Sequence, residues 1–89
     1  MDERKAVIKY SAMDDRMAEE AIHLAAYAMD KHKESKEIAD YIKKQFDQKY
    51  ERTWHCIVGK NFGSSITHGE QSLIHFTLDN YTFLLYKWG

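Results

Sequence analysis

The sequence predicts an α+β fold in which two helices pack on an antiparallel β-sheet. Apolar residues recur at steps of three and four across residues 14–50, as they do in amphipathic helices. Residues 53–86 are instead rich in β-branched and aromatic residues with glycine punctuation, and Asp79-Asn80 separates two alternating segments as a hairpin turn would. With 89 residues the chain is expected to form one domain, residues 1–89. A core this small commonly needs a metal, disulfides or a partner subunit, so an oligomer is one option.

The first half of the chain is expected to form a short strand and a helix. The segment KAVIKYS alternates as a strand does. A helix is then predicted from Asp14 to Lys31, with Asp14 and Asp15 in the first turn, where the helix dipole favours acidic groups. Its apolar face is marked by Met17, Ala21, Leu24, Ala25 and Ala28.

A second helix is predicted after the polar segment DKHKES, with Ser35 as its N-cap. Its apolar face is marked by Ile38, Ile42, Phe46 and Tyr50. The opposite side carries Lys43, Lys44 and Asp47. We interpret it as a solvent-exposed face, because series of charged residues on helices usually face solvent.

The predicted hairpin divides the C-terminal residues between two faces of the sheet. If Asp79 and Asn80 form the turn, Leu78 faces Tyr81 and alternate residues share a face. One face is apolar and is expected to pack on the helices: Ile74, Phe76, Leu78, Tyr81, Phe83 and Leu85. The other is mixed: Leu73, His75, Thr77, Thr82, Leu84 and Tyr86. We expect this mixed face to be covered by an interface, and the alternative is an ordinary half-hydrated sheet face.

The segment TWHCIVGKNFGSSITH contains residue types used in catalysis but lacks a catalytic arrangement. In an extended strand His55 and Cys56 point to opposite faces, so the histidine cannot act as the base for the thiol, and we interpret Cys56 as a small buried apolar residue. GKNFGSS departs from the spacing of a phosphate-binding loop. His55, His68 and His75 lack the paired spacing of a metal site. We therefore expect no catalytic residue, no metal and no cofactor.

Charge and composition argue against several other classes of protein. Thirteen Lys and Arg against fourteen Asp and Glu give a net charge of −1, without a basic block that would follow a nucleic acid. The single cysteine excludes an intramolecular disulfide. No apolar segment approaches the ~20 residues that cross a bilayer. We expect a cytosolic protein with no nucleic-acid partner and no transmembrane segment.

Gly59 and Gly63 suggest a strand that turns away from its own sheet and continues as FGSSITH. A strand that leaves its sheet needs a new neighbour. That neighbour is either a second copy of the chain or an extended peptide, and one strand can take both on its two sides.

Three segments carry a resemblance to a known family: RKAVIK, IKKQFDQKY, and TWHCIVGKNFGS followed by THGE. In this order they resemble the dynein light chain family of small dimeric hub proteins, over essentially the whole chain. The resemblance implies a strand-swapped homodimer with two grooves, each of which adds an extended partner segment as a β-strand, often with a Thr-Gln-Thr core. It implies the dynein intermediate chain and many unrelated proteins as partners, and a cytoplasmic location on the microtubule cytoskeleton.

The resemblance also assigns roles to individual positions. The peptide-binding residues that it implies, with the mixed face as the groove floor, are Lys36, Lys60, Asn61, Phe62, Gly63, Ser64, Ser65, Ile66, Thr67, His68, Leu73, His75, Thr77, Thr82 and Leu84. The dimer interface that it implies includes His55, Thr67 and Trp88. Acid is expected to split the dimer, because two protonated His55 side chains near a twofold axis would repel each other.

Departures from the family pattern modify these expectations. Ser35 replaces the usual glutamate. If Ser35 caps the second helix, the protein is expected to be less selective for a glutamine in the partner peptide. Leu73, His75 and Thr77 replace aromatic residues and make the floor more polar. Trp88 replaces a serine that can be phosphorylated, so that switch is expected to be absent and the dimer tighter.

Two functions remain open at this point. One is a non-catalytic, dimeric peptide-binding adaptor associated with dynein motor complexes. The alternative is a dedicated structural subunit of one cytoskeletal or membrane-associated assembly, without general peptide binding.

Overall fold

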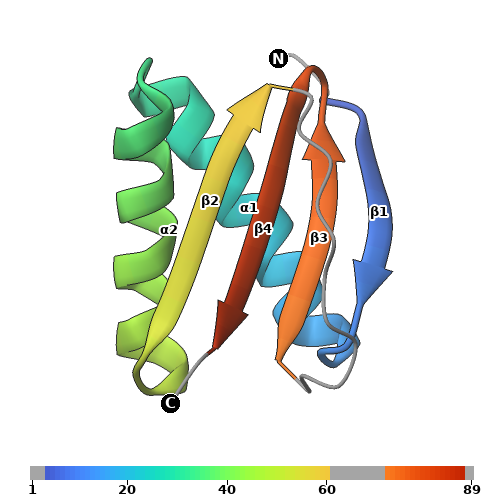
Figure 1. The fold of residues 1–89 in the computed structure, drawn as a ribbon, viewed down its shortest axis with the longest axis vertical. Helices are drawn as coiled ribbons and strands as arrows, with labels where there is room; N and C mark the ends of the chain where they lie inside the picture. Colours follow the sequence, from blue (N-terminus) through green and yellow to red (C-terminus); the bar gives the residue numbers. More distant parts are fainter. Residues whose placement is uncertain (1–3, 61–71, 88–89) are drawn as a thin grey trace.

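Two helices cover one face of a four-stranded antiparallel sheet (Figure 1). The computed structural model describes residues 4–60 and 72–87. The sheet order is β1-β3-β4-β2, which confirms the predicted arrangement of two helices on an antiparallel sheet. The elements, in chain order, are β1 (Ala6–Ser11), α1 (Asp15–Lys31), α2 (Ser35–Tyr50), β2 (Trp54–Lys60), β3 (Leu73–Leu78) and β4 (Tyr81–Lys87).

Helix α1 is capped by Asp14 and buries a face of small side chains. The Met17 N–H donates to Asp14 Oδ1 at 2.9 Å and so satisfies one of the free N–H groups of the first turn. The fully buried residues of α1 are Ala18, Ala21, Ala25 and Ala28. Because a methyl group is short, these alanines let the helix approach the sheet and α2 closely. The longer Met17 and Leu24 pack partly buried against this core.

Helix α2 begins differently from the sequence prediction. Ser35 is its first helical residue, and the N-cap is Glu34, which has the extended backbone of a cap with φ −91° and ψ 136°. The Glu34 side chain makes no capping hydrogen bond. The prediction that Ser35 caps α2 is therefore wrong, because the residue already has helical backbone geometry and the change of direction occurs one position earlier.

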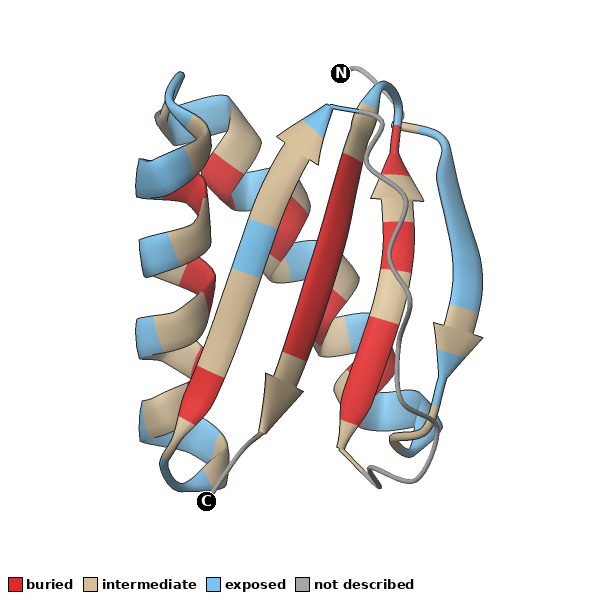
Figure 2. Ribbon diagram, viewed as in Figure 1, coloured by how far each residue is buried: buried red, intermediate tan, exposed pale blue. Residues whose placement is uncertain are grey.

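The core lies between the helices and the sheet. Ile38, Ile42 and Phe46 of α2 are buried, as their spacing predicted. Figure 2 shows the buried residues gathered on the sides of the helices that face the sheet and along β3 and β4. Trp54 at the start of β2 meets Phe46 edge-on, with ring centroids 4.9 Å apart and an interplanar angle of 76°. This aromatic pair fixes the end of α2 against the beginning of β2.

The β3–β4 hairpin has the predicted turn and register. Leu78 pairs with Tyr81, and Asp79 adopts a φ of 54° in the left-handed region, which aspartate tolerates. The apolar face of the hairpin packs on the helices, with Phe76 and Phe83 stacked at 4.9 Å. The Asp79 carboxylate accepts hydrogen bonds from the backbone N–H of Lys5 and from Arg4 Nη1, each at 3.0 Å. These contacts hold the turn against the residues that precede β1.

Candidate functional site

The mixed residues of the hairpin form one continuous surface on the sheet face opposite the helices. Cross-strand pairs place His75 beside Leu84, Thr77 beside Thr82, and Leu73 beside Tyr86. Strand β2 extends each row, because its residues His55, Ile57 and Gly59 lie opposite Tyr86, Leu84 and Thr82, respectively. We call this surface, formed by Leu73, His75, Thr77, Thr82, Leu84, Tyr86, His55, Ile57 and Gly59, the outer face.

Strand β1 adds two further residues to the outer face. Its pairing with β3 is irregular between Ile8 and Tyr10, so Val7 pairs with Thr77 and Tyr10 with His75. Without the irregularity, Val7 and Lys9 would share a face, because side chains alternate along a strand. The extra residue therefore turns the aromatic ring of Tyr10 to the same face as Val7.

The centre of the outer face is drier than a solvated sheet face. Leu73, Thr82 and Leu84 are only 3%, 5% and 8% exposed, although none of them belongs to the core beneath the helices. His75 shows the same effect, since desolvation, followed by the positive charge of Lys9, lowers the pKa of its imidazole. Ile57 on β2 is 46% exposed. The surface thus combines a dry centre with an apolar side chain that reaches solvent at its β2 side.

The two potentially reactive residues of β2 lie on opposite faces, as predicted for a strand. His55 stacks on Tyr86 on the outer face, with ring centroids 5.3 Å apart. Cys56 packs against the core beneath the helices. Desolvation, together with the negative charge of Asp40, raises the pKa of the Cys56 thiol to about 12. A thiol with a pKa this high is protonated at neutral pH and is a poor nucleophile.

The open edge of β2 borders the outer face. Within residues 4–60 and 72–87, β2 has β4 as its one neighbour and ends the sheet. An edge strand of this kind presents N–H and C=O groups that a further strand can pair with. The edge runs beside α2, and Figure 1 shows that β2 ends near the start of that helix. Lys60 and Lys36 therefore lie at the same end of the molecule, with Lys60 Nζ 5.7 Å from the centre of the Tyr81 ring.

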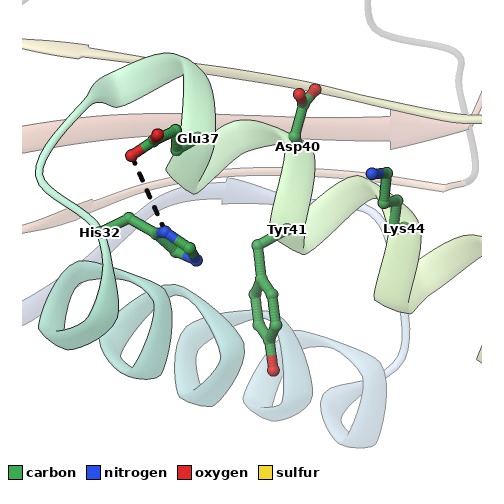
Figure 3. Close-up of a pocket in the computed structure, with 5 residues that line it drawn as sticks. All are labelled: His32, Glu37, Asp40, Tyr41 and Lys44. Carbon is green, nitrogen blue, oxygen red and sulfur yellow. Dashed lines mark ion pairs between the residues drawn. The ribbon is translucent and has the colours of Figure 1, made fainter.

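The start of α2 forms a polar surface at this end. Because the Glu34 side chain makes no cap bond, the N–H groups of the first turn are not satisfied by it. A pocket of about 270 Å³ lies beside this turn, and in Figure 3 Tyr41 points over α1 whereas Asp40 and Lys44 point away from it. His32 Nδ1 lies 3.8 Å from Glu37 Oε1 across the pocket. Its lining is of mixed charge: His32, Glu37, Asp40, Tyr41 and Lys44.

The structure brings together part of the site that the sequence predicted. Leu73, His75, Thr77, Thr82 and Leu84 share the outer face with the predicted interface residue His55. Lys36 is on a separate element. The predicted pairing segment, residues 61–68, and Trp88 lie outside the described residues.

Sequence reasoning missed Val7, Tyr10 and Ile57 as members of the outer face. Ile57 could have been predicted, because it lies two residues after His55 and alternate residues of a strand point to the same face. The pairing partners of β1 had no such local signal.

Residues 4–60 and 72–87 contain no group of three or more His, Cys, Asp or Glu side chains that could hold a metal ion. No helix in those ranges has the length and apolar character needed to cross a membrane.

Sequence comparison identifies the family. The family model described as dynein light chain type 1 matches residues 5–88. A curated dynein light chain from Schistosoma mansoni is 57% identical over 89 residues, which is 100% of both chains. The chain belongs to the dynein light chain family.

Solved structures of dynein light chain-like domains share the fold. The domain of the Fasciola hepatica calcium binding protein FhCaBP2 superimposes with a TM-score of 0.83 at 19% identity, over 99% of this chain and 95% of that one. The domain of CsTAL3 superimposes with a TM-score of 0.78 at 13% identity, over 92% of this chain and 90% of that one. At these identities the likeness concerns the arrangement of helices and strands alone.

Proposed function

We propose that this dynein light chain is a non-catalytic, strand-swapped homodimer that clasps extended segments of partner proteins. The observation that supports the proposal is the edge of β2, which no strand of residues 4–60 and 72–87 pairs with, beside the dry centre of the outer face. An unpaired edge next to a buried apolar surface is a liability in a monomer, because it invites pairing with another chain. A second copy removes this liability when its residues 61–68 pair with β2.

The partner segment pairs with the free side of the swapped strand. Main-chain hydrogen bonds supply much of the affinity in this mode, and pockets for alternate side chains supply the specificity. The outer face offers such a floor through Leu73, His75, Thr77, Thr82 and Leu84. Lys36 and the open N–H groups of the first turn of α2 offer polar contacts at the rim. This arrangement fits an adaptor of dynein motor complexes on the cytoskeleton, with the dynein intermediate chain among its partners.

The test combines oligomeric state with peptide titration. Sedimentation at pH 7.5 is expected to give a dimer, and titration calorimetry is expected to give one Thr-Gln-Thr peptide bound per subunit. The matched control is the same peptide with proline at alternate positions, which removes N–H donors from the added strand while keeping its length. A monomer that binds neither peptide, or equal affinity for both, would refute the proposal.

A pull-down of extended segments separates the adaptor from a dedicated structural subunit. Many unrelated short motifs are expected for an adaptor. One stoichiometric partner, together with a Thr-Gln-Thr peptide that fails to bind, would favour the dedicated subunit.

A further inference from the structure

The last turns of α2 lie beside the start of β2 (Figure 1). A second pocket is lined by residues of this region. It has a volume of about 540 Å³. Glu51 ends α2 with a positive φ of 69°, and the chain then reverses so that Arg52 and Thr53 face the last turns of the helix. The pocket is lined by Lys43, Lys44, Asp47, Gln48, Arg52 and Thr53.

The only carboxylate that lines this pocket is fully engaged. Asp47 Oδ2 forms an ion pair with Lys43 Nζ, one turn earlier on α2. Asp47 Oδ1 accepts a hydrogen bond of 2.8 Å from the backbone N–H of Trp54. Asp47 therefore compensates Lys43 and joins α2 to β2.

The pocket lining has three cations for this one carboxylate, so within the described ranges Lys44 and Arg52 form no ion pair of their own, although the charge of Arg52 also acts on Asp47. Lys44 and Arg52 are both exposed, and neither forms an ion pair with any residue of 4–60 or 72–87. Asp40, one turn before Lys44, makes no ion pair with it, and Glu51 is directed to Lys87 Nζ at 3.8 Å. The C-terminal end of a helix dipole contributes only about half a negative charge. The three lining cations, Lys43, Lys44 and Arg52, therefore outweigh Asp47 and the helix dipole together, and the lining is locally positive although the whole chain has a net charge of −1.

The remaining lining groups suit an oxyanion. The Arg52 guanidinium can hold a carboxylate through two parallel N–H bonds, and Lys44 adds a point charge with three donors. The Gln48 amide and the Thr53 hydroxyl are further donors. We propose that this pocket binds an acidic segment of a partner protein through its Asp or Glu carboxylates. The pocket shares no lining residue with the outer face, so the acidic segment would contact a surface other than the groove floor.

The test uses fluorescein-labelled hexaglutamate and hexaglutamine peptides, followed by fluorescence anisotropy at low salt. The wild-type protein is expected to bind hexaglutamate at least roughly tenfold more tightly than hexaglutamine, because two charge-assisted contacts form only with the acidic peptide. The preference is expected to fall steeply between about 0.05 and 0.5 M salt, since both cations are exposed. Equal affinity for the two peptides, or a preference that salt does not change, would overturn the proposal.

The decisive variant is K44E/R52E, with K44Q/R52Q as a second variant that removes charge without reversing it. Each is expected to weaken hexaglutamate binding roughly tenfold or more. The control is K5E, an exposed lysine at the other end of the molecule, which is expected to change binding by less than about twofold because it lies beyond the ~10 Å screening length. An equal loss in K5E would mean that overall charge, and not this pocket, attracts the peptide. Circular dichroism of each variant establishes that the fold is retained.

Two other occupants have distinct outcomes. The charge variants could shift the dimer dissociation constant in sedimentation while added hexaglutamate leaves it unchanged. In that case the pocket holds a second copy of the chain and the proposal is wrong. If a peptide with one phosphoserine among alanines binds more tightly than hexaglutamate, the pocket is a phosphate site and the proposal is also wrong. Backbone NMR shifts upon hexaglutamate addition are expected at Lys44, Gln48, Arg52 and Thr53, and shifts confined to Ile57 and Leu84 would place the peptide in the groove instead.

Discussion

Single side chains hold the ends of elements together, and Asp47 is the clearest example. Its carboxylate is 14% exposed and is held by both the Lys43 ammonium and the Trp54 N–H. Desolvation alone would raise the pKa of this carboxyl, but the bonds from Lys43 and Trp54 and the charges of Lys43 and Arg52 outweigh desolvation and lower it. A carboxyl with a lowered pKa in the folded state stabilises the fold above its ordinary pKa of about 3.9. That stabilisation is lost as the pH falls through the folded value.

The substitution Asp47→Asn is therefore expected to reduce the free energy of unfolding at pH 7 by about 1–3 kcal/mol, because it removes a charge-assisted pair. The acid-induced loss of stability below about pH 4 is expected to become smaller. Urea unfolding at pH 7 and at pH 3 measures both. Asp40→Asn, an exposed carboxylate on the same helix, is the control, and an equal effect at both positions would contradict the role given to Asp47.

His75 has the opposite kind of dependence. Its pKa is lowered in the folded state, so the unfolded chain takes up a proton first as the pH falls below the ordinary value of about 6.5. The stability contributed by the neutral imidazole is present above that value and is lost as the pH falls towards the folded pKa.

His75→Gln is thus expected to flatten the change in unfolding free energy between about pH 7 and pH 5, because glutamine does not titrate in this range. Thermal unfolding across these pH values measures the effect. His23→Gln on the exposed side of α1 is the control. A slope that His75→Gln leaves unchanged would show that another group carries the dependence.

Among the elements, α2 connects stability with the proposed recognition. A helix without a side-chain cap leaves N–H groups open, and these are suited to a polar ligand. Ser35 was expected to bond these N–H groups and so to reduce the selectivity for glutamine in a bound peptide. This expectation does not hold, because Ser35 is inside the helix.

We accordingly expect Glu34→Ser to stabilise the fold by about 0.5–1 kcal/mol, since serine is a better N-cap. The same change is expected to weaken binding of a Thr-Gln-Thr peptide, because the new cap competes with the peptide glutamine for the N–H groups. Binding of a peptide whose glutamine is replaced by alanine is expected to stay unchanged. Chemical unfolding and titration calorimetry give the two readings. The control is Ser11→Thr, a conservative change on β1, and a Glu34→Ser protein that binds the glutamine peptide with unchanged affinity would exclude this role for the start of α2.

At the scale of the whole molecule, the proposed dimer is expected to be joined at the β2 side of the outer face. His55 stacks on Tyr86 in the row nearest the start of β2. In the proposed dimer, a fixed positive charge at this position would lie close to its symmetry mate, and the two charges would repel each other. His55→Lys is expected to give a monomer in sedimentation at pH 7.5. His32→Lys, at the start of the α1–α2 connection and away from the outer face, is expected to leave the dimer intact. A His55→Lys protein that stays dimeric at micromolar concentration would place the interface elsewhere.

The sequence predicted the parts of the site that depend on local periodicity. The parity of the hairpin about Asp79 and Asn80 separated Phe76 and Phe83, which pack on the helices, from His75 and Thr82 on the outer face. The alternation in β2 separated His55 from Cys56 and removed a false catalytic pair. In both cases the signal lies within a few residues, because the side-chain direction in a strand is fixed by its pleat.

The sequence by itself thus determined the two helices, the hairpin, the two faces of the sheet and, through the family signature, membership of the dynein light chain family. Only the tertiary structure decided that β2 lies beside β4 with an edge that no described residue pairs with, that an irregularity in β1 turns Tyr10 to the outer face, and that Lys44 and Arg52 share a pocket whose one carboxylate, Asp47, is already paired with Lys43. Strand neighbours and ion pairs join residues that are distant in the chain, and their choice follows from how the whole core packs. The tertiary structure also decided that α2 starts at Ser35. A helix begins where the preceding backbone can turn, and here that turn occurs at Glu34.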